Sequence, residues 1–171
     1  FERHVHGETG GVRVVPQAEV YLGPDALFKT EFELVKGRVG EIDIDYETWC
    51  QEGSSLEMVA RIAGSEDDLI KISEIGHLEE EGAAGALLSR VAVSDSAEAD
   101  IYNELTASAP QAKGHVDCKE IVQDQAIAKA TPVVDVRHPL ARVTHEAAIG
   151  SVDSKQLQTL MARGMSEEEA T

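Results

Sequence analysis

A short repeat in the later half of the chain restricts the possible folds more than any other feature. Small apolar residues recur at Ala99, Ala112, Ala126 and Ala141, in steps of 13, 14 and 15 residues, with strand-like segments and no helices between them. A period of this size indicates stacked rungs. Two steps would form one coil of a two-sheeted, right-handed parallel β-helix. An antiparallel sandwich or barrel of equally short strands is the alternative.

Composition supports a coil and excludes some partners. Large aromatic side chains fit poorly inside a narrow coil, and only 4% of the 171 residues are aromatic. The net charge of −17 argues against nucleic acid or an anionic membrane and suits a protein that binds metal ions or a basic partner. No apolar run approaches the roughly 18 residues of a transmembrane helix, and no signal peptide is visible. Two cysteines are too few for a disulfide framework and predict a cytoplasmic location.

Both cysteines lie on apolar strand faces. Glu41–Cys50 is the cleanest alternating segment, and Cys50 shares its apolar side with two isoleucines. Cys118, in GHVDCKEIV, also points inward by parity. Further strands are expected at Leu56–Ala63 and Leu69–Ile75, and a loop at 78–85. Without other information, two such cysteines are most simply inert core residues.

The end of the chain changes from a strand pattern to a helix pattern. Alternation around Thr144 turns His145 inward and Glu146 outward. Asp153 with Gln156 forms a capping-box pair that starts a helix, and a second pair begins at Ser166. The first helix carries an apolar stripe formed by Leu157, Leu160 and Met161. We therefore expect a β-helix core over 1–150 and the start of a C-terminal helical segment over 151–171, within a longer chain.

The last block resembles a known family. A strand ending in HEAA-IG, an acidic turn and QLQTLMARGMSEEEA are similar to the end of the SufB/SufD core, the scaffold of SUF iron–sulfur cluster assembly. VDCKEIV stands 27 residues before His145, as a cysteine strand does in that family. Tyr46-Glu47-Thr48-Trp49-Cys50, followed by Ile62-Ala63-Gly64 and by His77 thirteen residues after Gly64, resembles a second SufB segment.

The resemblance implies a scaffold rather than an enzyme, and it assigns roles to four residues. Cys50 would accept sulfur, which would pass through the coil interior. Cys118, His145 and Glu146 would hold the metal of a nascent iron–sulfur cluster, with Glu146 the weakest member because alternation turns it away from His145.

The resemblance also implies partners. Leu157, Leu160 and Met161 would dock a SufC-type ABC ATPase, or would simply cap the end of the solenoid. The chain would assemble with a SufB/SufD-type partner or with itself as a homodimer, and would receive sulfur from a donor protein. FAD is possible in the assembled complex. Two other classes stay open: a β-helical polysaccharide-binding or lyase-like protein, and a purely structural solenoid.

Overall fold

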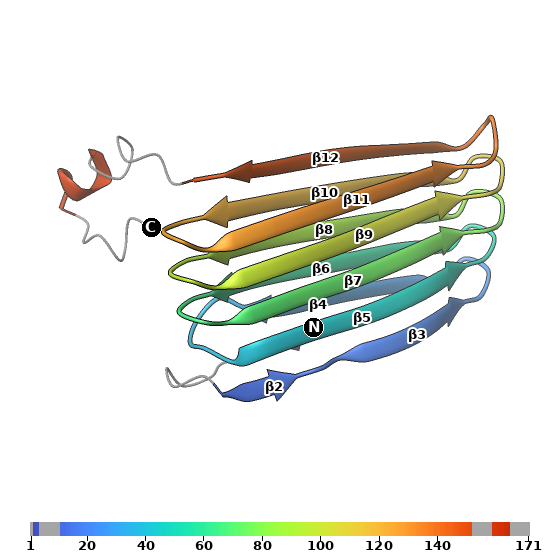
Figure 1. Ribbon diagram of the computed structural model, residues 1–171. Coiled ribbons are helices and arrows are strands. Elements are labelled where there is room, and N and C mark those ends of the chain that lie inside the picture. Colours follow the sequence, from blue (N-terminus) through green and yellow to red (C-terminus); the bar gives the residue numbers. More distant parts are fainter. Residues whose placement is uncertain (1, 4–10, 152–158, 165–171) are drawn as a thin grey trace.

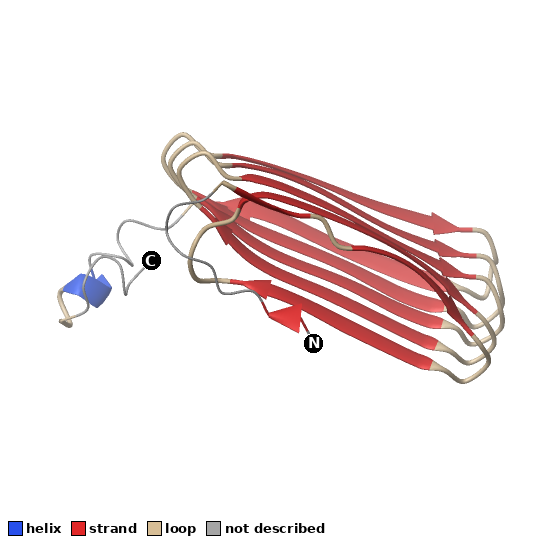
Figure 2. Cartoon of the chain, turned by 90° about the horizontal axis from the view of Figure 1, so that it is seen from below, coloured by secondary structure: helices blue, strands red, loops and turns tan. Residues whose placement is uncertain are grey.

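The strands wind into a parallel β-solenoid of about five turns, whose two sheets face each other (Figures 1 and 2). The computed structural model describes residues 2–3, 11–151 and 159–164. The first sheet has the order β1 (Glu2–Arg3), β4 (Leu27–Leu34), β6 (Ser55–Gly64), β8 (Ala84–Val93), β10 (Lys113–Val122) and β12 (Arg142–Gly150). The second has the order β11 (Ile127–Val136), β9 (Glu98–Ala107), β7 (Leu69–Leu78), β5 (Gly40–Cys50) and β2 (Val12–Val14), with β3 (Gln17–Leu22) also paired to β5.

Every described strand pair is parallel, and each coil adds 28 to 30 residues. Glu41 of β5 lies opposite Leu69 of β7, and Leu69 lies opposite Glu98 of β9. From β3 onward, consecutive strands belong to alternate sheets, and strands one coil apart lie side by side. The β-helix prediction is confirmed, and the antiparallel alternative is wrong.

The sequence repeat comes from the residue that precedes each strand. Ala83, Ala97 and Ala112 are fully buried, and each donates its N–H to the carbonyl oxygen three residues earlier. Ala126 and Ala141 make the same bond in the next two turns. The repeat position is thus Ala97 rather than Ala99, and the steps are a regular 14 or 15 residues. In the later coils a small side chain occupies the position where the chain folds back over the core, whereas Asp68 makes the same bond before β7.

The core consists of inward side chains stacked in register. Ile44, Ile72 and Ile101 lie side by side on β5, β7 and β9, and none is exposed. The sheets approach closely: a Cβ added at Gly76 would lie 2.7 Å from Leu105 Cδ2 and 2.8 Å from Leu56 Cδ2. Alternation of apolar and polar residues therefore reflects a narrow, filled interior.

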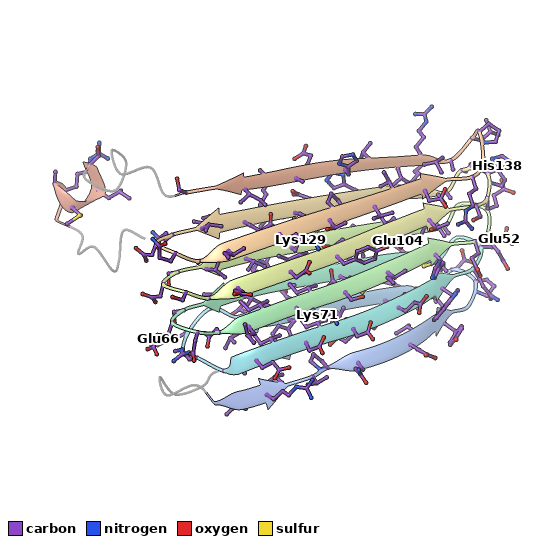
Figure 3. All side chains as sticks on the ribbon, in the orientation of Figure 1. Glu52, Glu66, Lys71, Glu104, Lys129 and His138 are labelled. Carbon is purple, nitrogen blue, oxygen red and sulfur yellow. The ribbon has the colours of Figure 1, made fainter. Side chains whose placement is uncertain are left out.

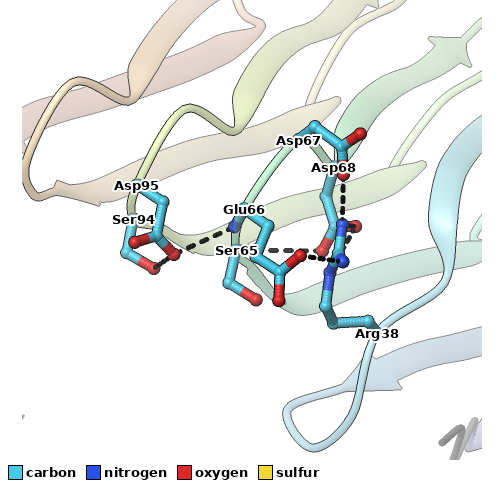
Figure 4. Close-up of polar contacts among 7 residues, drawn as sticks. All are labelled: Arg38, Ser65, Glu66, Asp67, Asp68, Ser94 and Asp95. Carbon is cyan, nitrogen blue, oxygen red and sulfur yellow. Dashed lines mark hydrogen bonds and ion pairs between the residues drawn. The ribbon is translucent and has the colours of Figure 1, made fainter. Parts of the chain in front are cut away.

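An ion-pair cluster fastens the turns at one end of the solenoid (Figure 4). The guanidinium of Arg38 lies 2.6 Å from a Glu66 oxygen, 2.5 Å from Asp67 and 2.8 Å from Asp68. The next turn is joined to this one because the backbone N–H of Glu66 donates to Asp95 Oδ2 at 3.0 Å. The loop before β5 is thus held to the acidic turn one coil further on.

Two expectations need correction. Within the described residues, helix is confined to 159–161, so no substantial C-terminal helix is seen there. The starts expected at Asp153 and Ser166 lie outside those residues. The segment 78–85 is only partly a loop, because β7 extends to Leu78 and β8 begins at Ala84. The boundary at residue 150 stays a prediction.

Candidate functional site

Cys118 lies in the middle of β10 with its side chain inside the coil. Cys118 is fully buried, and its thiol donates a hydrogen bond across the interior to the Oδ1 of Asn103, with 3.4 Å between Sγ and Oδ1. The hydroxyl of Ser89, on the neighbouring strand β8, donates to the same oxygen at 3.4 Å. Burial raises the pKa of the Cys118 thiol, which the Ser89 hydroxyl partly offsets. The thiol is therefore protonated at neutral pH.

Glu74 completes what we call the inner polar cluster: Glu74, Ser89, Asn103 and Cys118. The Nδ2 of Asn103 donates to Glu74 Oε2 at 2.7 Å, and Glu74 is only 2% exposed. Burial raises the pKa of Glu74 to about 7, although the bond from Asn103 opposes this. A connected set of polar groups thus crosses from one sheet to the other in an otherwise apolar interior.

His145 lies on the strand next to Cys118. In β12 it stands opposite Val116, while Cys118 stands opposite Ala147, two positions further along. Strand geometry then gives about 8 Å between the Cα atoms of Cys118 and His145. His145 has the inward parity that alternation predicts, yet it is exposed. The reason is that β12 is the last described strand and pairs only with β10.

Glu146 projects from the other face of β12. It stands opposite Asp117, and Lys119 Nζ lies 3.6 Å from its Oε2. Asp117 also accepts hydrogen bonds from Arg90 and Lys119; burial pushes its pKa up, but these bonds outweigh burial and lower it. The structure therefore places Glu146 in an outer network of ion pairs, away from His145.

Outer charges on the second sheet are paired in a similar way. Lys71 of β7 and Lys129 of β11 project from this face (Figure 3). Asp43, Lys71, Asp100 and Lys129 are in register on four strands, so that opposite charges alternate. Lys129 Nζ lies 3.3 Å from Asp100, and Lys71 Nζ lies 3.6 Å from Asp43. These side chains stabilise strand pairing and point to no ligand.

Cys50 is also fully buried, at the end of β5. Burial raises the pKa of its thiol to about 11, and a hydrogen bond from Ser54 only partly opposes this. Cys50 and Cys118 lie in different sheets, about two and a half coils apart, which is about 12 Å along the solenoid axis. Thr48 lies two positions before Cys50 and is also buried, with a hydroxyl that has no partner. Polar groups thus recur in the interior between the two thiols.

An aromatic row on the outer face was missed by the sequence analysis. The rings of Tyr21 and Trp49 stack with centroids 4.6 Å apart, and Trp49 and His77 stack at 5.2 Å. His77 Nε2 lies 2.7 Å from Glu47 Oε1. The three rings are 28 residues apart along the chain, so only the register brings them together. Tyr21, at the end of the row, is 70% exposed.

The sequence analysis also missed buried polar residues. Asn103 shares its parity with Ile101 and Leu105, and Glu120 shares that of Cys118. Glu120 is 2% exposed, and burial raises its pKa to about 7, while Arg90 opposes this. A polar residue at an inward parity position was the signal that could have identified each of them.

The described part of the chain does not by itself bring three His, Cys, Asp or Glu side chains together in a geometry that could hold a metal ion. Of the expected docking residues, Leu160 is half-buried and Met161 is 41% exposed, while Leu157 lies outside the described residues. None of the described helical residues forms a helix long and apolar enough to cross a membrane.

The fold and its interior define a class: a parallel β-solenoid that encloses two thiols and whose last described strand bears an exposed histidine. Comparison with known proteins gives the family. Residues 49–171 match the SufBD core domain of SUF system FeS cluster assembly, so the chain belongs to the SufBD family.

Curated relatives agree over nearly the whole chain. An iron–sulfur cluster assembly SufBD family protein of Methanocaldococcus jannaschii is 39% identical over 170 residues, which cover 99% of this chain and 54% of the relative. One from Pyrococcus horikoshii is 35% identical over 170 residues, covering 99% and 52%. The chain therefore spans about half the length of these relatives.

Proposed function

We propose that this chain is the core of a scaffold for SUF-type iron–sulfur cluster assembly, on which delivered iron and sulfur form a nascent cluster. The observation that carries the proposal is the position of Cys118, which is buried one strand from the open end, where His145 is presented on the same face. Thiolate and imidazole are both good ligands for iron. Family membership supports the same reading.

Sulfur is received at Cys50 and moves inside the coil. A persulfide on a buried thiol is shielded from dissolved thiols and oxidants, which would otherwise remove it. Between Cys50 and Cys118, polar side chains line the interior at Thr48, Glu74 and Asn103. These groups supply hydrogen bonds along a route that would otherwise be entirely apolar.

Partners complete the site, because the described part of one chain brings together too few ligands for a metal ion. The exposed inward face of β12 suits a SufB/SufD-type partner or a second copy of this chain. Glu146 takes part only across such an interface, since it projects from the outer face of β12. A SufC-type ATPase docks on the segment containing Leu160 and Met161, and a donor protein supplies sulfur. The family description names iron–sulfur clusters and no flavin, so FAD is not part of the proposal.

The test is cluster reconstitution on the full-length protein. The buffer is reducing, because we expect the protein to work in the cytoplasm. With inorganic sulfide supplied, Cys118→Ala should abolish the cluster absorbance, whereas Cys50→Ala should retain it. With sulfur supplied through a desulfurase, both variants should fail. Unchanged reconstitution in Cys118→Ala would contradict the proposal. Co-elution with a SufC-type ATPase, weakened in Met161→Ala, tests the partner separately.

A further inference from the structure

Glu120 of β10 is a buried carboxyl group without hydrogen-bond partners. The residue is 2% exposed, and neither Oε1 nor Oε2 has a partner in the described structure. A buried acceptor left unsatisfied costs stability. The other inward carboxyl of the cluster differs, because Glu74 accepts a bond from Asn103.

The neighbours of Glu120 are aliphatic, so an apolar residue at this position would avoid the cost. In register along the first sheet, the same inward position holds Ile62 on β6, Val91 on β8 and Ile149 on β12. An aliphatic residue at 120 would continue this row and pack without penalty. The fold therefore gains nothing from the carboxyl, and a destabilising polar group in a core is an indication of function.

The carboxyl group lies on the same strand face as the thiol of Cys118. Two residues along a strand separate their Cα atoms by about 6.6 Å, and both side chains point into the coil. Two ligands at this spacing can bind one ion, because the long Glu120 side chain can reach back toward Sγ. Only β12 lies between this pair and the open end of the solenoid.

We propose that Glu120 and Cys118 together form the inner half of a ferrous-iron site, with Glu120 supplying the carboxylate ligand. This inference rests on the proposed function and names the residue that takes up the iron beside the thiol. Glu146 is the less suitable carboxylate, because it lies on the outer face and is paired with Lys119. Binding forms one Fe–S and one Fe–O bond and releases the thiol proton to solvent, with no change in oxidation state.

The experiment uses cobalt(II) as a spectroscopic substitute for ferrous iron. Cobalt is titrated without oxygen into the full-length protein carrying Cys50→Ser, so that Cys118 is the one thiol of this chain able to give a thiolate-to-cobalt absorption band. Glu120→Gln should weaken cobalt binding by about tenfold or more, since losing even an outer partner of a metal ligand costs about 10 to 100-fold. Glu98→Gln, which removes an exposed carboxylate from the outer face of β9, is the matched control and should bind as the parent does.

The outcomes distinguish an error in the role of Glu120 from an error in the scaffold proposal. If Cys118→Ser removes the band and Glu120→Gln leaves the affinity unchanged, the role of Glu120 is wrong and the scaffold proposal stands. If the parent shows no thiolate band, or keeps it in Cys118→Ser, both are wrong.

Thermal unfolding without metal provides an independent readout. Glu120→Gln and Glu120→Leu should melt at or above the parent temperature, because the unpartnered carboxyl is gone. A lower melting temperature in both variants would show that the carboxyl stabilises the fold, which overturns the inference.

Discussion

Glu74→Gln should remove a defined part of the pH dependence of folding. The side chain lies inside the coil at 2% exposure, and burial raises its pKa from 4.5 to about 7. A carboxyl with a higher pKa in the folded state binds its proton more tightly there than in the unfolded chain. Stability therefore falls as pH rises from about 4.5 to about 7, and the loss is complete above that range.

The magnitude follows from the two pKa values. At about 1.4 kcal/mol per pKa unit, the difference between 4.5 and about 7 corresponds to a loss of about 3 kcal/mol in the free energy of unfolding. Glutamine has nearly the same shape, and its carbonyl oxygen can still accept the 2.7 Å bond from Asn103. The variant keeps the packing and the hydrogen bond but has no proton to lose.

Urea unfolding of the full-length protein and the variant, measured from about pH 5 to about pH 8, gives the comparison. The difference in unfolding free energy between variant and wild type should grow by about 2.5 kcal/mol over this range, in favour of the variant, because part of the loss has already occurred at about pH 5. Glu98→Gln, which removes an exposed charge from the outer face of β9, should follow the wild-type profile. Parallel profiles for wild type and Glu74→Gln would refute the reasoning.

Three further predictions concern packing, thiol reactivity and the turn cluster. Gly76→Ala should cost about 1–3 kcal/mol of unfolding free energy by overpacking, whereas Gly23→Ala, which meets nothing within 4 Å, should cost little; urea unfolding compares them. Cys50 and Cys118 are buried with raised pKa values, so both should react slowly with a thiol reagent until urea unfolds the protein; rapid labelling of the native protein would contradict this. Arg38→Met should lower the melting temperature because it leaves three carboxylates of one turn unpaired, and an unchanged melting curve would show that the cluster is not stabilising.

The local sequence pattern was sufficient to predict much of the fold. Strict alternation in Glu41–Cys50 placed Cys50 inside, because a strand turns successive side chains to opposite faces whatever its neighbours are. The same rule put His145 and Glu146 on opposite faces of β12. The spacing of the small residues indicated the coil length, because a buried alanine precedes several strands where the chain folds back.

Contacts between coils could not be read from the sequence in this way. The hydrogen bonds from Asn103 to Glu74 and from Cys118 to Asn103 join residues 29 and 15 positions apart, and the aromatic row of Tyr21, Trp49 and His77 spans two coils. Such pairings depend on the register of strands that are distant in the chain, and a shift of one residue would turn each side chain to the other face.

The sequence by itself therefore determined which side chains face inward, since parity is a property of each strand alone. It also determined the family, since the blocks around Cys118 and after Thr144 are specific. Only the tertiary structure decided which inward polar groups meet, that Cys50 is about two and a half coils from Cys118, and that His145 is exposed. These depend on strand register and on where the stack of coils ends. The unpartnered carboxyl of Glu120 belongs to the same group, because a missing hydrogen bond can be seen only when every neighbour is in place.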